Sequence, residues 1–341
     1  MKRCLRIAPT LAFACCIGMA VAGAEEPVEV VDHSGAIVSV EQPVERIASV
    51  YGIGTYYVYA LGAGDQLVAG WYVGLKSVAQ ASETMVRFEP RLEELMLYGD
   101  PNVEEIVRRG AQLVLVDASR HAEFAEQMSD LGVPTIQYLV ETPEALLEAM
   151  RLTGQALGSE ANARAEAFVA DFERILKGVS EDLADLADED RAHVLFLGTS
   201  PLQVASGDMY QTRMIEAAGG RSVSADLLGY WNEVNLEQIL LWDPDVILIP
   251  PYGPIQPADL LDNADWSAIR AIRDGRVCRM PRLIAPMDTP VPESLLGVLW
   301  MAGVFYPDRL TLDLMEEAAR FYADYYGFDL GEDDLALLTV R

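Results

Sequence analysis

Cysteine and histidine are scarce in this chain, which has four Cys and three His among 341 residues. Cys4, Cys15 and Cys16 lie in an N-terminal segment that we expect to be removed, which leaves Cys278 alone in the mature chain. One cysteine excludes an internal disulfide, and it also excludes a thiolate metal cage or an iron–sulfur cluster within one chain. Cys278 stands in a strand pattern and is predicted to be a small buried residue.

Basic residues are also few, because 25 Lys and Arg stand against 53 Asp and Glu and give a formal net charge of −28. Nucleic acid and anionic lipid are therefore poor partners, since both are repelled by an acidic surface. Hydrophobic residues make up 51% of the chain, so it is not a disordered acidic tail. The length is sufficient for two domains of ordinary size.

Long apolar runs are missing as well. No stretch reaches about 18 uninterrupted apolar residues, so we expect no retained membrane helix. The short apolar run 11–21 follows a basic start and precedes Ala22-Gly23-Ala24, which is the pattern of a secretory signal peptide. We therefore predict that residues 1–24 are cleaved after Ala24 and that the mature protein is periplasmic.

A lipid anchor on Cys15 or Cys16 is the alternative for the N-terminus. The residues before them, Phe13 and Ala14, make a poor lipobox, and the apolar segment ahead of them would be very short. We therefore favour a cleaved protein without an anchor.

One 15-residue pattern is present twice, at 102–116 and 235–249, and the two copies align without a gap. Each copy begins with an Asn that can cap a helix, and Glu105 or Gln238 stands three residues on as a capping-box partner. A wholly apolar run ends each copy and is typical of a buried parallel strand. The repeat therefore predicts two similar lobes.

The repeat also places one acid, Glu104 or Glu237, at the same position in the first turn of both helices. The simplest interpretation is that these acids complement the helix dipole. A role in binding a partner is the alternative, and spacing alone does not choose between them.

Strands and helices alternate along the rest of the chain, which indicates α/β lobes with parallel sheets. A β-hairpin at 28–40 is expected to cover the first lobe. The tract 142–186 is helical, with a break at Gly158 and a new cap at Ser159, and is interpreted as a stiff interlobe connector. The expected division is a signal peptide (1–24), an N-terminal lobe (25–141), a connecting helix region (142–188) and a C-terminal lobe (189–341).

Several segments together carry a family resemblance. They are Arg-Ile-Ala-Ser-Val-Tyr at 46–51, the Asn-Val-Glu-Glu-Ile of the first repeat copy, Met-Ile-Glu-Ala-Ala-Gly-Gly at 214–220, and the second copy from 234 to 247. In this order and spacing they resemble the periplasmic binding proteins of iron-siderophore, heme and vitamin B12 ABC importers. The resemblance covers nearly the whole mature chain. It implies two Rossmann-like lobes bridged by a long helix, with a ligand between them and only a small closure.

The resemblance also implies a role for the paired acids. In this family, one Glu per lobe at the positions that match Glu104 and Glu237 docks on arginines of the membrane permease. The expected partner is an ABC permease dimer in the inner membrane, which offers two equivalent sockets to a monomeric receptor. Each exposed ion pair contributes only about 0 to 1 kcal/mol, which suits a receptor that must dock and leave.

The ligand cleft is expected where loops leave the carboxyl ends of the strands. Those loops carry many aromatic side chains and a few polar ones, and in the family the matching loops often carry aromatics that touch the ligand. The candidate ligand-binding residues are Tyr51, Trp71, Tyr72, Tyr98, Arg120, His121, Tyr138, Thr199, Ser200, Asp208, Tyr210, Tyr230, Trp231, Tyr252, Arg282 and Asp288. Each aromatic taken alone is as well explained by the core, and Arg282 with Asp288 is also explained as a mutual ion pair.

Aromatic walls with a few polar groups suit a metal chelate better than a bare ion. A bare ion needs several converging His, Cys or carboxylate ligands, and of the three histidines only His121 is in a cleft loop. No metal-ligating residues and no cofactor of the protein's own are therefore predicted. Arg120, Arg282 or Arg87 would meet carboxylates or catecholates of an iron-siderophore, heme or corrinoid-like ligand.

Part of the family binds molybdate or tungstate instead, and an arginine with backbone amides at a helix start would hold these oxyanions equally well. The family's tryptophan near the C-terminal cleft loop is replaced here by Pro286-Met287-Asp288, which weakens the expectation of B12-like binding.

An enzyme is the alternative of a different class. Gly52-Ile-Gly54 begins like a dinucleotide fingerprint, but Tyr57 stands at the third glycine position. There is no Gly-x-Ser-x-Gly elbow and no His-Glu-x-x-His helix. A chelatase or nitrogenase-like subunit would share the fold, but the signal peptide and the single mature cysteine disfavour it. A receptor that feeds a sensor kinase rather than a permease stays open.

Overall fold

The computed structural model describes residues 26–339. The predicted signal peptide and its cleavage after Ala24 lie outside these described residues. Among residues 26–339, no helix is both long and apolar enough to cross a bilayer.

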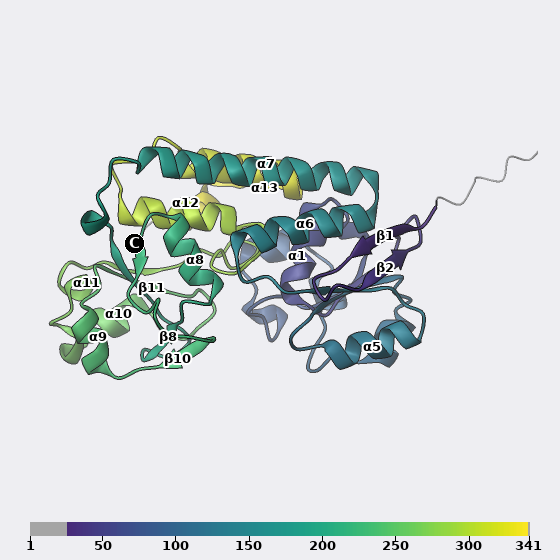
Figure 1. The fold of residues 1–341 in the computed structure, drawn as a ribbon, viewed down its shortest axis with the longest axis horizontal. Coiled ribbons are helices and arrows are strands. Elements are labelled where there is room, and N and C mark those ends of the chain that lie inside the picture. The colour runs from purple at the N-terminus through teal and green to yellow at the C-terminus, as the bar shows by residue number, and fades with distance from the viewer. Residues whose placement is uncertain (1–25, 340–341) are drawn as a thin grey trace, which may run out of the picture.

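Two four-stranded parallel sheets form the centres of two lobes, as predicted (Figure 1). The first sheet has the order β4-β3-β5-β6 and the second the order β12-β11-β7-β9. The strands of the first sheet are β3 (Ile47–Ser49), β4 (Leu67–Gly70), β5 (Leu113–Asp117) and β6 (Thr135–Tyr138). Those of the second are β7 (His193–Phe196), β9 (Arg221–Ser222), β11 (Val246–Ile249) and β12 (Val277–Arg279).

The sequence repeat maps onto equivalent places in the two sheets. Counted along the chain, the repeat strands β5 and β11 are each the third strand of their parallel sheet, and each lies between the first and the fourth strand of that sheet. Leu113 pairs with Ile47 in β3, and Val246, 133 residues later, pairs with Val194 in β7. The four strands at the sheet centres are buried except at His193 and Asp117, which stand at strand ends, and this burial explains their apolar runs.

The helices follow the strands as an alternating fold requires. The first lobe has α1 (Gly52–Ala60), α2 (Glu83–Phe88), α3 (Leu92–Leu95), α4 (Val103–Arg108) and α5 (Ala122–Asp130), with the predicted hairpin β1 (Val28–Val31) and β2 (Ile37–Val40). The second lobe has α8 (Tyr210–Ala217), α9 (Leu236–Trp242), α10 (Pro257–Leu261), α11 (Arg270–Arg273) and an antiparallel pair, β8 (Gln203–Ala205) and β10 (Trp231–Glu233).

The two repeat asparagines cap their helices as expected. The side chain of Asn102 accepts a hydrogen bond from Glu105 N at 3.1 Å, and that of Asn235 accepts one from Gln238 N at 2.8 Å. The reciprocal half of the predicted capping box is not formed at α4. The Glu105 carboxylate instead pairs with Arg109 one turn later, at 2.7 Å, because a charged partner is available there.

The helical tract 142–186 forms two helices, α6 (Pro143–Leu157) and α7 (Ser159–Asp182), which pack against each other as a hairpin. The break falls at Gly158 as predicted, with φ at 103°. The predicted cap at Ser159 is wrong, because Ser159 is already helical and its side chain makes no capping bond. α6 runs out along the first lobe, and α7 returns and extends along both lobes (Figure 1).

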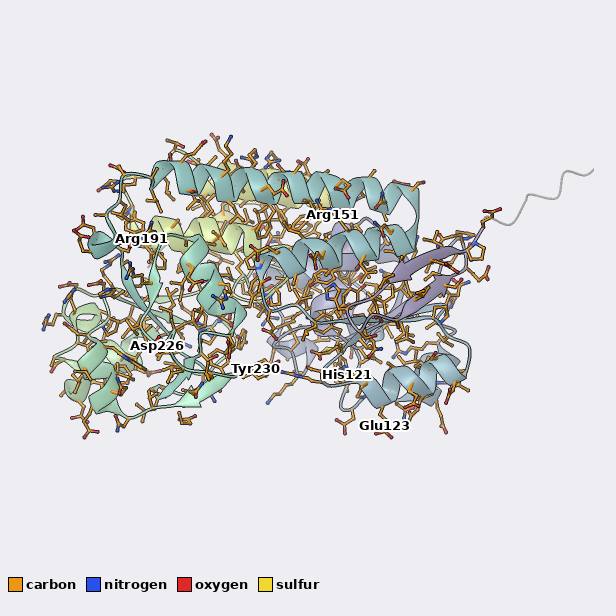
Figure 2. All side chains as sticks on the ribbon, viewed as in Figure 1. His121, Glu123, Arg151, Arg191, Asp226 and Tyr230 are labelled. Carbon is orange, nitrogen blue, oxygen red and sulfur yellow. The ribbon has the colours of Figure 1, made fainter. Side chains whose placement is uncertain are left out.

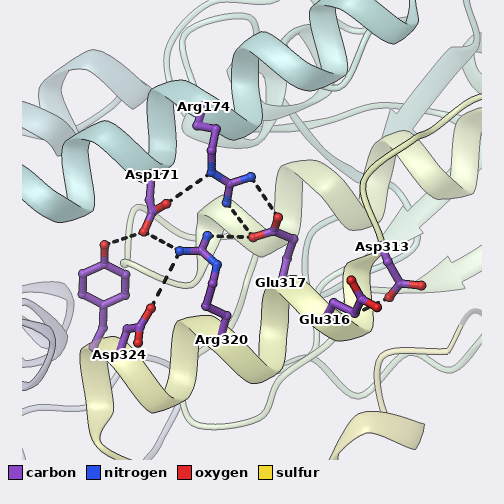
Figure 3. Close-up of polar contacts among 8 residues, drawn as sticks. Asp171, Arg174, Asp313, Glu316, Glu317, Arg320 and Asp324 are labelled. Atoms are coloured by element: carbon purple, nitrogen blue, oxygen red, sulfur yellow. Dashed lines mark hydrogen bonds and ion pairs between the residues drawn. The ribbon is translucent and has the colours of Figure 1, made fainter.

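The end of the chain runs beside α7 and returns to the first lobe through α12 (Ser294–Phe305), α13 (Leu314–Tyr326) and α14 (Glu332–Ala336). Ion pairs fasten α7 to α13, and Figure 3 shows Arg174 between Asp171 and Glu317, with Arg320 bridging the same two acids. Asp334 in α14 accepts a hydrogen bond from Thr84 of α2 at 2.6 Å. The chain therefore connects the two lobes twice on one side.

The α6–α7 hairpin depends on a close helix crossing at Gly154. A methyl group at this position would lie 2.8 Å from Cβ of Ala165 and 3.0 Å from O of Ala161. We therefore expect Gly154→Ala to lower the free energy of unfolding by about 1–3 kcal/mol through overpacking. Gly303→Ala in α12, where the nearest atom is 3.8 Å away, is the control and should raise stability by up to about 1 kcal/mol. The urea unfolding midpoints of the two variants measure these changes in stability. Equal shifts in both variants would contradict a close helix crossing at Gly154.

Candidate ligand-binding cleft

A cavity of about 640 Å³ lies between the two lobes at the carboxyl ends of their strands. Both lobes contribute side chains to it, and Figure 2 shows His121 of the first lobe and Tyr230 of the second near their junction. Ten of the residues predicted from the sequence line it: Tyr51, Trp71, Tyr72, Tyr98, Arg120, His121, Tyr210, Tyr230, Trp231 and Tyr252. The loops after the strands therefore converge as expected for α/β sheets.

The aromatic wall is held by contacts behind it. Tyr51 stacks on Tyr138 with ring centroids 5.9 Å apart, and Trp71 meets His121 edge to face at 5.3 Å. The Tyr72 hydroxyl is 2.8 Å from that of Tyr59, which in turn donates to a buried carboxylate. These supports restrict the rotamers of the wall, so its shape is largely set before a ligand enters.

The remaining predicted residues do not line the cavity. Tyr138 is fully buried behind Tyr51, and its hydroxyl bonds Thr153. Thr199 and Ser200 belong to the turn that leads to Gln203, and Asp208 accepts a hydrogen bond from Gly229 N at 2.7 Å. Arg87 pairs with Asp334 at the far end of α2. Tertiary packing determines where each of these side chains lies, and this cannot be predicted from its position in a loop of the sequence.

Two helix N-termini open into the cavity without a side-chain cap. α1 begins after Tyr51 and α8 after Met209, and neither helix has an acid in its first turn. α5, which begins after His121 at the same cavity, also lacks a side-chain cap, but it carries Glu123 in its first turn. The first N–H groups of α1 and α8 therefore face the cavity, together with the positive end of each helix dipole.

Residues 47–282 match the model of a family described as periplasmic binding protein. The match covers more than half of the chain and includes both sheets and most of the cleft. This chain belongs to the periplasmic binding protein family. The resemblance drawn from the repeat and its flanking segments is thereby confirmed.

Named relatives cover most of this binding protein. The molybdate-binding protein MolA of Haemophilus influenzae is 25% identical over 280 residues, which are 75% of this chain and 80% of MolA. An uncharacterized ABC transporter substrate-binding lipoprotein, YvrC of Bacillus subtilis, is 24% identical over 83% of this chain and 86% of its own. A periplasmic solute binding protein from Veillonella parvula superposes with a TM-score of 0.79 at 27% identity, over 92% of this chain and 97% of that one.

The family has small-molecule ligands and permease partners, and its members are exported binding proteins, not enzymes. In this binding protein the lining residues that the sequence did not single out as ligand contacts include Lys76, Asp117, Glu141, Met209 and Gln211. Asp117 could have been found, because it directly follows the apolar run of the first repeat copy. Its Oδ1 accepts hydrogen bonds from Ser119 N, Ser119 Oγ and Arg120 N and so shapes the loop that carries Arg120 and His121.

The cleft favours the neutral form of the His121 imidazole over the charged form. Burial lowers its pKa, and the nearby Asp117 only partly offsets that effect. Within residues 26–339 no three His, Cys, Asp or Glu side chains are grouped so that they could hold a metal ion.

Tyr252 lies between the cleft and a buried carboxylate, that of Asp288. Its ring packs directly on Gly74 of the first lobe, where an added methyl would lie 2.7 Å from Cβ of Tyr252. Its hydroxyl donates to Asp288 at 2.8 Å, and Asp288 is fully buried behind it. Arg282 and Asp288, which were predicted as ligand contacts, do not line the cavity. The alternative of a mutual ion pair is not formed among the described residues either, because the Arg282 guanidinium points to Val73 O, at 3.5 Å.

Asp288 makes stability depend on pH. Burial raises the pKa of Asp288 to about 6, from an ordinary value of 3.8. Both states hold the proton below pH about 4, whereas the unfolded state ionises first as the pH rises, so the free energy of unfolding falls toward pH 6. At about 1.4 kcal/mol per pKa unit the loss is about 3 kcal/mol.

Asp288→Asn should abolish this part of the pH dependence, because an amide carries no titrating proton and still accepts a bond from Tyr252. Urea unfolding between pH 4 and 7 measures the difference from wild type. Asp130→Asn, at an exposed carboxyl, is the control. A pH profile identical to wild type in Asp288→Asn would contradict the assignment.

Proposed function

We propose that this binding protein captures a metal chelate of low net charge in the cleft and delivers it to an ABC importer. One observation carries the proposal: a cavity of about 640 Å³ is walled by eight Tyr and Trp side chains and is lined by two cationic and two anionic residues. The charged residues are Lys76, Arg120, Asp117 and Glu141, so their formal charges cancel.

The size and the lining of the cavity both favour an organic complex. Pockets of about 300 to 1,000 Å³ enclose ligands of drug-like size, whereas an oxyanion with four oxygens fills only a small part of this space. A chelate brings its own metal donors and asks the protein for flat apolar contacts, which Tyr98 and Trp231 supply from the two lobes. A near-neutral interior suits a chelate whose ligand charges are balanced by its metal.

A molybdate or tungstate receptor is the second candidate. The uncapped starts of α1 and α8 and the cation Arg120 favour it, as does the similarity to the molybdate-binding protein. Asp117 and Glu141 disfavour it, because two carboxylates in the same cavity repel a dianion. We therefore place the chelate first.

The proposal includes three further statements about the protein. It is exported with cleavage after Ala24, acts as a monomer and has no catalytic activity. The basic start and apolar run of residues 1–24 support the first statement. The relatives named above, which are binding proteins, support the third.

We also propose that Glu104 and Glu237 dock on the permease. Both side chains are exposed, both lie in the first turn of a repeat helix, and neither forms an ion pair within the described chain. Each is therefore available to an arginine of a partner. The net charge of −28 adds salt-sensitive steering toward basic loops.

Metal analysis and an absorption spectrum of the protein purified from the periplasm test the ligand class directly. A neutral ferric trihydroxamate should bind, and Tyr98→Ala or Trp231→Ala should each weaken it about tenfold, since an aromatic contact contributes about 0.5–1.5 kcal/mol beyond its area. Leu241→Ala, an exposed residue outside the cavity, is the control and should not change binding. Tight binding of molybdate with no chelate bound would favour the second candidate.

The docking proposal predicts that Glu104→Ala with Glu237→Ala leaves ligand affinity near wild type but lowers transport on the order of tenfold, because two weak ion pairs are lost. Transport by reconstituted permease in vesicles measures this effect. The control is Glu160→Ala with Glu332→Ala, which removes two exposed first-turn acids from α7 and α14 and changes the net charge equally. Equal loss in both double variants would leave only a nonspecific charge effect.

A further inference from the structure

The two carboxylates of the cleft differ in how they are bound. Asp117 is tied into its own loop, because its Oδ1 accepts three hydrogen bonds from Ser119 and Arg120 N. Glu141 stands between β6 and α6 and lines the cavity, and its carboxylate faces the Tyr230 hydroxyl and the backbone N–H of Tyr210, which both belong to the other lobe. Glu141 is therefore the carboxylate whose charge is directed into the cavity.

Glu141 is surrounded by the groups that an anion would use. α6 packs against α8, which brings Glu141 near the uncapped start of that helix. Burial raises the pKa of Glu141, as does Asp117, whereas Arg120, the Tyr230 hydroxyl and the backbone N–H of Tyr210 act in the opposite direction. In the same way Glu141 is the main cause of a raised pKa at Tyr230.

These three groups are a cation, a phenol and a helix N-terminal amide, and they come from both lobes. An oxyanion entering the cavity would need the same three donors. Arg120 forms no ion pair within residues 26–339, so its guanidinium is available to a charge in the cavity.

We propose that Glu141 is the charge-selecting residue of the cleft: its carboxylate occupies the position beside Tyr230 and the start of α8, in the same cavity as Arg120, and so excludes small oxyanions. The inference rests on the proposed use of the cleft as the ligand site. A chelate of low net charge loses little by contact with Glu141 and gains the aromatic walls. A dianion meets a like charge at the place where its donors are, and its affinity falls.

Glu141→Gln tests this selection, because it removes the charge and keeps the shape of the side chain. With sodium molybdate as the probe, titration calorimetry should show at least about tenfold tighter binding to the variant than to wild type, equivalent to about 1.4 kcal/mol. Glu141→Ala should show a gain as well. Glu148→Gln, an exposed acid of α6 outside the cavity, makes the same change in net charge and should bind molybdate as wild type does.

Three outcomes would overturn the inference: unchanged molybdate affinity in both Glu141 variants, an equal gain in Glu148→Gln, or tight molybdate binding by wild type. Thermal unfolding establishes that each variant is folded. A neutral ferric trihydroxamate, measured beside molybdate, should bind Glu141→Gln as it binds wild type. Failure of the trihydroxamate to bind any variant would count against the proposed chelate function and would leave the molybdate comparison intact.

Discussion

The double connection between the lobes is the constraint on which the cleft depends. α7 carries the chain along both lobes, and the segment from α12 to α14 runs back to pack on α2. Where these paths lie side by side, Arg320 pairs with Asp171 at 2.9 Å (Figure 3). Burial raises the pKa of Asp171, but hydrogen bonds from Arg320 and Tyr325 outweigh it and leave that pKa below its usual value. The charged form is therefore the stable one, and the two helices stay paired over the ordinary pH range.

The fold could be predicted from the sequence as far as local patterns decide it. The repeat predicted two like lobes, and the pairing of β5 and β11 in the same register confirms that interpretation. The reversal between α6 and α7 could not be read in this way, because the helical pattern is the same for a straight connector and for a hairpin. The close approach of Gly154 to Ala165, which the hairpin requires, becomes visible only when both helices are placed.

The residues of the candidate site also fall into those that the local sequence predicts and those that it does not. Aromatics directly after strands, such as Tyr51 and Trp71, line the cavity because the end of a parallel strand determines where its loop begins. Asp288 follows no such rule, and it is buried behind Tyr252 because residues 283–291 run through the interior between the lobes. Glu141 could not be predicted as a cleft residue, since nothing in its local sequence distinguishes it from other acids before a helix. Its character comes from α8, which is distant in the sequence.

The two copies of the repeat share their backbone geometry more closely than they share their side chains. α4 and α9 are each followed, at equivalent positions of the repeat, by a residue with positive φ: Gly110 at 69° and Asp243 at 42°. The Asp243 carboxylate accepts a hydrogen bond from Arg270 N at 2.7 Å, and this bond helps to offset the strain of the left-handed conformation. Each helix is short and directly joined to a central strand, so Glu104 and Glu237 move with the sheets that frame the cavity. The distance between these two acids is therefore set by how the two lobes are joined, through α7 and the helices that run beside it.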